Sequence, residues 1–151
     1  MAADESTIHA SAVLIGAKAA LIRGPAGSGK SRLVWDLVTT AAQGTLPFAR
    51  LVADDRVHVE SHSGRLLVRP AQPLAGLIEI HGLGIRRITF EPVAAVGLII
   101  DLAAADAGRY PGPDAASAMI AGVRLPRLAV AAGTAALPLV LGVLHTPPAG
   151  D

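Results

Sequence analysis

The strongest chemical signal in the sequence is a glycine-rich run of eight residues that ends in a lysine and a serine. It matches the pattern G-x-x-x-x-G-K-[ST] in full, and its members are Gly24, Pro25, Ala26, Gly27, Ser28, Gly29, Lys30 and Ser31. Glycines let backbone N–H groups turn inward around phosphate oxygens. The lysine reaches the β- and γ-phosphates, and the serine hydroxyl is placed to ligate Mg²⁺. The run therefore predicts a phosphate-binding loop for ATP with Mg²⁺.

The segments on both sides of this run are those that such a loop requires. Residues 11–16 and 19–23 are rich in β-forming side chains and predict a tight hairpin. Residues 31–43 carry apolar side chains at helical spacing, and Gly44 is a helix stop. A helix that starts near Lys30 also brings its positive dipole end to the phosphates. This setting favours a functional loop over an accidental glycine-rich turn.

Two acidic sites are alternative candidates for the catalytic carboxylate. Asp101 ends the apolar run 97–100, a pattern typical of a strand-end aspartate that holds Mg²⁺ through water. Asp54 and Asp55 end the apolar run 51–53, and adjacent carboxylates on an extended chain point to opposite faces. For each site the alternative is an ordinary acid at the end of a strand, and the residues alone leave the choice open.

A third carboxylate, Glu79, interrupts an apolar segment. The alternating run 77–81 predicts a strand in which Glu79 shares a face with Leu77 and His81. A carboxylate on an otherwise apolar strand needs a partner. A metal ion is one candidate for that partner, and a structural arginine is the other.

The rest of the chain predicts an α/β fold with a mixed sheet, many hairpins and few helices. We expect a single domain over residues 1–151, because this length allows one domain and hardly two. The further predicted elements are strands at 50–53, 56–60, 65–69, 95–101 and 123–130 (the last interrupted by Pro126), an exposed loop at 103–117, and a closing helix at 134–144.

Composition excludes several classes of function. Apolar residues make up 52% and aromatic residues 3%, so the core must be aliphatic. The 13 basic and 12 acidic side chains nearly balance, and the sequence has no basic stripe that would bind nucleic acid or an anionic membrane. The absence of cysteine excludes a disulfide scaffold and a thiolate zinc site. The absence of asparagine excludes the Asn-Lys-x-Asp motif that reads guanine, which disfavours a GTPase.

No segment has the pattern of a membrane span or a signal peptide. The uncharged run 128–144 carries Gly133 and Pro138 and is only weakly hydrophobic, so strand followed by helix is the better interpretation. The first ten residues carry acids where a signal peptide needs lysine or arginine. We therefore expect a cytoplasmic protein.

Several motifs stand in a specific order along the chain. His9 precedes the phosphate loop, which is followed by VADDRV at 52–57 and IEIHGLGI at 78–85. In this order they resemble the catalytic domain of HPr kinase/phosphorylase, in the short proteobacterial form that has no separate N-terminal domain. The resemblance covers nearly the whole chain, with a catalytic core at about residues 6–145. The last two motifs are far more specific than the phosphate loop.

The resemblance implies a P-loop domain similar to phosphoenolpyruvate carboxykinase, usually assembled as a hexamer. Members of the family transfer phosphate from ATP to a serine of HPr, the phosphocarrier of the sugar phosphotransferase system, and many also run the reverse phosphorolysis. The family pattern puts the general base on Asp54 and the magnesium ligands on Ser31 and Glu79. It puts the active-site histidine and lysine on His9 and Lys30, and a loose match puts a late arginine on Arg109.

The sequence departs from the family pattern at several places, including about seven extra residues between Lys30 and Asp54. His81 replaces an arginine, Arg32 stands where an acid is common, and no basic residue follows Gly133. We therefore expect the kinase direction to work and the phosphorylase direction to be weak or missing. Two other hypotheses remain: a different P-loop phosphotransferase or NTPase that uses Asp101, and a non-catalytic regulator that senses ATP.

Overall fold

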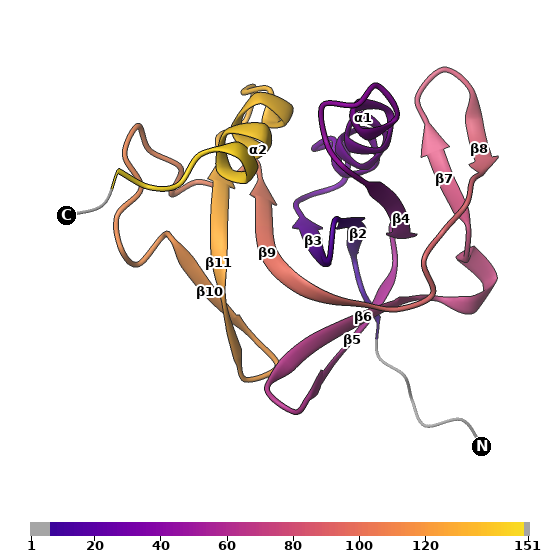
Figure 1. Cartoon of the computed structure of the whole chain (residues 1–151), viewed down its shortest axis with the longest axis horizontal. Coiled ribbons are helices and arrows are strands. Elements are labelled where there is room, and N and C mark those ends of the chain that lie inside the picture. Colours follow the sequence, from indigo (N-terminus) through magenta and orange to yellow (C-terminus); the bar gives the residue numbers. More distant parts are fainter. Residues whose placement is uncertain (1–6, 150–151) are drawn as a thin grey trace.

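The chain forms a curved mixed sheet with two helices on one side of it, as Figure 1 shows. The computed structural model describes residues 7–149. The helices are α1 (Lys30–Ala42) and α2 (Ala136–His145), with a short 3₁₀ turn at Gln72–Leu74. The strands are β1 (Thr7–Ile8), β2 (Ala10–Ile15), β3 (Lys18–Arg23), β4 (Ala49–Ala53), β5 (Val57–His62), β6 (Arg65–Pro70), β7 (Leu77–Ile80), β8 (Gly84–Arg87), β9 (Ala94–Leu102), β10 (Ser117–Ile120) and β11 (Val123–Val130).

The main sheet is organised around β9. Its strand order is β1-β5-β6-β9-β3-β2-β4, and β11 pairs with β9 and with β10. The start of β9 lies antiparallel to β6, while its later residues run parallel to β3 and β11. The pair β7 and β8 forms a separate two-stranded hairpin. The predicted mixed sheet with few helices is confirmed.

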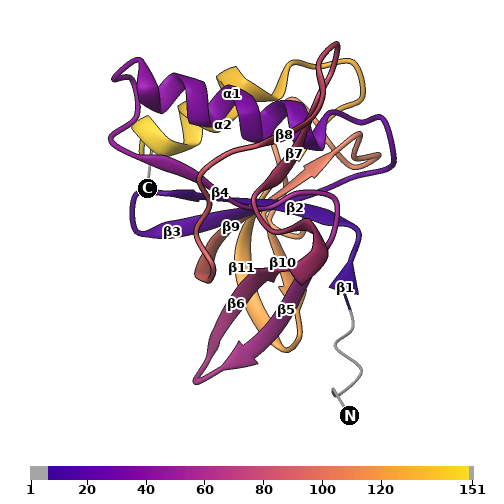
Figure 2. The same ribbon diagram turned by 90° about the vertical axis from the view of Figure 1, so that its right-hand side faces the viewer.

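Two aliphatic clusters fill the two sides of the sheet. Because side chains alternate along a strand, β3 sends Ile22 to the helix side and Leu21 to the other side. Figure 2 shows α1 and α2 on one side of the central strands and the β5–β6 hairpin on the other. The helix-side cluster includes Ile22, Leu33, Val34, Leu37, Ile78, Ile100 and Val140, and the second cluster includes Leu21, Val52, Val57, Leu66 and Val68.

Most predicted elements agree with the structure, but the short strands β1 and β8 were not predicted, and the C-terminal strands differ in detail. Pro126 does not interrupt β11, because only residues 127–130 pair with β9 and the missing N–H breaks no bond of that ladder. The predicted loop at 103–117 is followed by β10, a four-residue strand that the sequence analysis did not identify. Among the described residues, no helix is long and apolar enough to cross a membrane.

Candidate functional site

The glycine-rich loop connects β3 to α1, as its motif predicts. Gly29 caps the helix with φ +101°, a left-handed conformation that favours glycine, and α1 begins at Lys30. Gly24 is required for a different reason. A Cβ on Gly24 would lie 2.5 Å from Ser28 Oγ and 3.1 Å from Leu102 Cβ, so a side chain has no room there. The loop is therefore shaped by glycine, and the unpaired N–H groups of the first helical turn lie next to it.

Lys30 folds back over the loop that precedes it. Its side chain is almost wholly buried, and Nζ donates hydrogen bonds to the backbone oxygens of Gly24, at 2.7 Å, and Pro25, at 3.1 Å. The hydroxyl of Ser28 is buried in the same loop and has no hydrogen-bond partner within residues 7–149. A buried cation bonded only to carbonyls, beside an unsatisfied hydroxyl, fits a phosphate-binding loop.

Asp54 is the point at which four separate segments converge. Its side chain is buried and follows directly after β4. Ser31 Oγ, on α1, lies 2.8 Å from both carboxylate oxygens. Ser11 Oγ, on β2, donates to Oδ1 at 2.7 Å, and the backbone N–H of Glu79, on β7, donates to Oδ2 at 3.2 Å. These bonds satisfy the buried carboxylate and join it to the serine of the phosphate loop.

Asp55 has a different partner from Asp54, but the chain bends here and is not extended as predicted. Its backbone has φ +71°, and its Oδ1 lies 2.6 Å from Nε2 of His9. Unlike Asp54, this pair is open to solvent, with side-chain exposures of 42% for His9 and 62% for Asp55. The structure therefore brings His9 to the rim of the cluster, through Asp55.

Glu79 contacts the cluster through its backbone N–H, and its side chain is exposed. Its neighbour Ile78 is wholly buried in the helix-side core, whereas Glu79 lies on the exposed face of β7. The Glu79 carboxylate is therefore open to solvent, and its role as a magnesium ligand stays a prediction. No group of three or more acidic or histidine side chains among residues 7–149 is close enough to hold a metal ion.

Asp101, the competing acid, is held by two arginines. Arg23 donates to it from Nε at 2.7 Å and from Nη2 at 2.8 Å, and Arg127 donates from Nε to Oδ2. Burial raises the pKa of Asp101, but the hydrogen bonds and charges of Arg23 and Arg127 outweigh it and lower the pKa overall. Arg127 continues the network to Asp106, at 2.8 Å and 3.0 Å. In this structure Asp101 is an ion-paired acid within the sheet.

Arg109 is not joined to the cluster. It lies exposed in the segment after β9, and its guanidinium carbon is 5.3 Å from the centre of the Tyr110 ring. Within the described part of the chain, no hydrogen bond or ion pair connects it to Asp54 or Lys30. No sequence pattern indicated Ser11, Arg23 or Arg127, because single serines and arginines in strands carry no local signal.

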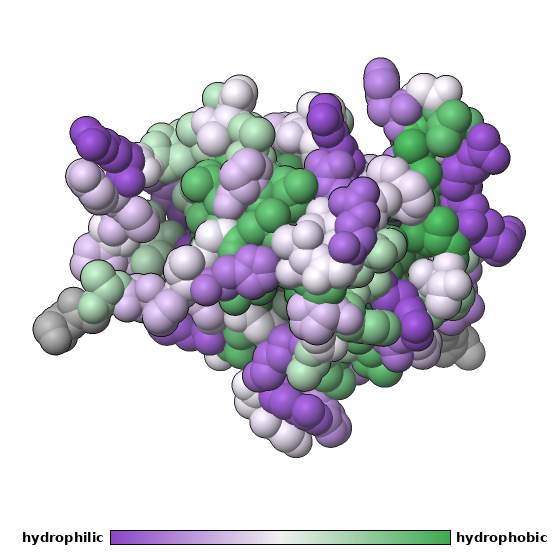
Figure 3. Space-filling model, turned by 45° about the horizontal axis from the view of Figure 1, so that its top comes forward, coloured by the Kyte–Doolittle hydropathy of each residue, from purple (hydrophilic) through white to green (hydrophobic). Residues whose placement is uncertain are grey.

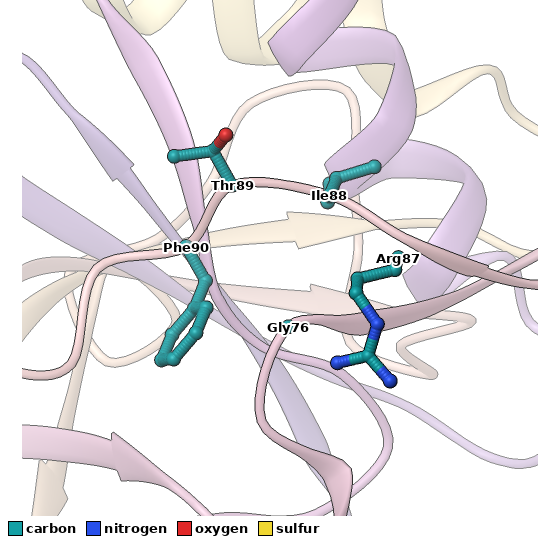
Figure 4. A pocket seen from close by; sticks show the side chains of 5 residues that line it. All are labelled: Gly76, Arg87, Ile88, Thr89 and Phe90. Atoms are coloured by element: carbon teal, nitrogen blue, oxygen red, sulfur yellow. The ribbon is translucent and has the colours of Figure 1, made fainter.

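A hollow in the surface is separate from this cluster. It has a volume of about 540 Å³ and lies where β8 ends, lined by Gly76, Arg87, Ile88, Thr89 and Phe90. Figure 4 shows Arg87 and Phe90 extending to the same side of the backbone. None of these residues belongs to the phosphate loop. The candidate site is therefore defined by the converging side chains around Asp54 and not by a deep pocket.

Comparison with known proteins shows which family the chain belongs to. The model of the family "HPr Serine kinase C-terminal domain" matches residues 1–106, and the chain belongs to this family. Arg109 lies beyond the matched residues.

Two curated relatives carry the same family name. The chain is 39% identical over 84 residues to the HPr kinase/phosphorylase of Streptococcus thermophilus, which is 55% of this chain and 25% of the relative. It is 32% identical over 87 residues to that of Clostridium beijerinckii, which is 58% of this chain and 26% of the relative. The chain thus matches about a quarter of the length of these relatives.

A solved structure shows the same fold. The Hpr(Ser) kinase/phosphatase from Coxiella burnetii superposes with a TM-score of 0.71, covering 92% of this chain and 93% of that chain at 23% identity. The family resemblance that the motifs predict is confirmed. The individual roles of His9, Lys30, Ser31, Asp54 and Glu79 stay predictions.

Proposed function

We propose that the chain is the P-loop catalytic core of a serine kinase that transfers the γ-phosphoryl group of ATP to HPr. One observation carries the proposal: the serine of the phosphate loop is hydrogen-bonded at 2.8 Å to the buried carboxylate of the family's ADD motif. This contact joins a nucleotide-binding element to a candidate general base in a chain of the HPr serine kinase family.

The residues present suit ATP with Mg²⁺. The loop 24–29 and Lys30 would hold the phosphates, with the Lys30 ammonium exchanging its backbone carbonyls for phosphate oxygens. Ser31 and Glu79 offer a hydroxyl and a carboxylate, which are hard oxygen ligands of the kind that Mg²⁺ prefers. When bound, Mg²⁺ supplies positive charge that offsets the charge of the phosphates.

Asp54 is the proposed general base. It would accept the proton of the acceptor serine hydroxyl as the new bond from serine oxygen to phosphorus forms and the bond to the β-phosphate oxygen breaks, releasing ADP. His9 holds Asp55 at the exposed rim, where a protein substrate enters. Arg109 remains a candidate for stabilising the transferred phosphoryl group, provided that its loop approaches the site.

A protein acceptor is supported by the surface next to the site. The β7–β8 hairpin, whose Glu79 N–H contacts Asp54, exposes Leu83 and Ile85 at 60% and 64%. Figure 3 shows apolar surface at this hairpin flanked by hydrophilic side chains. Apolar side chains exposed beside a catalytic group are typical of a contact surface for another protein.

Three further inferences rest on the resemblance to the HPr kinase/phosphorylase family. We infer a core similar to phosphoenolpyruvate carboxykinase, a cytoplasmic location, and a homo-oligomer that is a hexamer in the family pattern.

The test is transfer of label from γ-labelled ATP to purified HPr in the presence of Mg²⁺. Wild-type protein should label a serine of HPr, and Lys30→Ala should abolish turnover while the circular dichroism spectrum stays unchanged. Full activity of a folded Lys30→Ala variant would refute the assignment of the loop. Binding of ATP without any transfer would support the non-catalytic regulator instead.

A further inference from the structure

Ser11 is a buried polar side chain in an otherwise apolar strand. It lies on β2 between Ala10 and Ala12, and all three residues are inaccessible to solvent. A buried hydroxyl is destabilising unless it is hydrogen-bonded. Both bonds of Ser11 go to the acidic pair: its Oγ donates to Asp54 Oδ1 at 2.7 Å and accepts from the backbone N–H of Asp55 at 3.3 Å.

The bond to Asp54 determines how that carboxylate is turned. Ser31 Oγ lies 2.8 Å from both oxygens, so Ser31 does not distinguish one oxygen from the other. The remaining donors each bind one of the two oxygens. Ser11 Oγ binds Oδ1 at 2.7 Å, and the Glu79 N–H binds Oδ2 at the longer distance of 3.2 Å. Without Ser11, the rotation of the carboxylate would rest on the weaker of these two bonds.

The bond to Asp55 supports the turn that follows. Asp55 has a left-handed backbone with φ +71°, which is unfavourable for a residue other than glycine. The Ser11 hydroxyl accepts the N–H of this residue, and the side chain of Asp55 then reaches His9. The Ser11 hydroxyl therefore contacts both residues of the acidic pair: the carboxylate of Asp54 and the backbone N–H of Asp55, whose carboxylate lies at the rim.

We propose that Ser11 is a positioning residue for phosphoryl transfer, acting through Asp54 and not by touching the substrate. The inference rests on the proposed function, in which Asp54 takes the proton of the acceptor hydroxyl. A misdirected base slows the chemical step, while the phosphate loop and Lys30 still bind ATP. Loss of the Ser11 hydroxyl should therefore lower kcat and leave KM for ATP nearly unchanged.

The experiment compares Ser11→Ala, which removes the hydroxyl, with Ser11→Thr, which keeps it. Transfer from γ-labelled ATP to HPr is measured as kcat and as KM for ATP. Thr40→Val is the matched control, because Thr40 is also buried but its hydroxyl bonds only the Asp36 backbone oxygen within α1. We expect kcat to fall about 10- to 100-fold in Ser11→Ala, with KM for ATP within about threefold of wild type. Ser11→Thr and Thr40→Val should stay within about threefold of wild type in both parameters.

The outcomes separate this inference from the proposed function. If wild type transfers label and Asp54→Asn does not, but Ser11→Ala is as fast as wild type, Ser11 does not position the base. A folded Ser11→Thr variant as slow as Ser11→Ala would also overturn the proposal. If wild type itself transfers no label to HPr, the proposed function fails and this inference fails with it. Should Ser11→Ala not fold, Ser11→Cys, with a similar shape and a much weaker donor, takes its place under the same criteria.

Discussion

Replacing Asp101 by asparagine is expected to weaken the fold while leaving phosphoryl transfer largely intact. Asp101 accepts hydrogen bonds from two guanidinium groups, and its side chain is 15% exposed, against 33% for Arg23 and 12% for Arg127. Asparagine keeps the shape but loses the charge, which leaves two partly buried cations facing a neutral amide. The same substitution at a magnesium-binding aspartate would instead abolish transfer.

The size of the effect follows from the number and exposure of these bonds. A hydrogen bond to a charged group contributes roughly 1.5–3 kcal/mol, and removing one partner of a buried ion pair costs roughly 3–5 kcal/mol. We expect Asp101→Asn to lower the free energy of unfolding by about 2 kcal/mol, because Arg23 is partly exposed and asparagine retains some of the hydrogen bonds. For a chain of this size that corresponds to a fall in Tm of about 4–8 °C.

The assay pairs thermal unfolding with single-turnover transfer to HPr for Asp101→Asn and Asp54→Asn. We expect Asp54→Asn to lose about 10²- to 10⁴-fold in rate, as for a lost general base, and Asp101→Asn to lose mainly stability. Asp36→Asn is the control, because Asp36 forms only a long ion pair of 3.8 Å with Arg32, which is 83% exposed. An Asp101→Asn variant with unchanged Tm and no transfer would refute the reasoning and favour the alternative NTPase.

Three further predictions use other parts of the structure. Because the folded-state pKa of Asp101 is lowered, its ion pairs stabilise the fold above the pKa of the unfolded chain, and this contribution is lost as the pH falls below about 4; acid titration of Tm should be steeper in that range for wild type than for Asp101→Asn, and equal slopes would contradict it. Gly24→Ala should weaken ATP binding at least tenfold in calorimetry, because a Cβ would lie 2.5 Å from Ser28 Oγ; unchanged affinity would show that the loop adapts. His81 places an imidazole where the family pattern has a permanently charged guanidinium, so phosphate-dependent release of pyrophosphate from phosphoserine-HPr should be slow in wild type and faster in His81→Arg; comparable forward and reverse rates in wild type would contradict the charge argument.

Much of the local structure could be predicted because its causes lie within short stretches of chain. The hairpin of β2 and β3, the glycine-rich loop and α1 follow from apolar periodicity and from glycine at positions that need it. The VADDRV and IEIHGLGI motifs indicated the family, and the family model confirms it. The different directions of Asp54 and Asp55 were predicted from an extended chain, but Asp55 lies in a bend with a left-handed backbone.

The contacts of the two acidic sites needed the tertiary structure. The residues alone left the choice between Asp54 and Asp101 open, and only the family resemblance put the general base on Asp54. The parallel register of β3 and β9 sets Arg23 beside Asp101, although the two residues are 78 positions apart. The fold sets Ser31 beside Asp54 across 23 positions. The two acids therefore have different partners: arginine for Asp101 and the serine of the phosphate loop for Asp54.

The sequence by itself determined most of the elements, the phosphate loop and the family, because each of these is encoded by neighbouring residues. Tertiary structure alone decided that Ser11 is bonded to the acidic pair, that Glu79 is solvated on the outer face of β7, and that Arg127 belongs to the network of Asp101. A side chain's hydrogen-bond partners depend on which strands become neighbours and in which register. Strand order and register are set by burial of the whole apolar core, and no single segment specifies them.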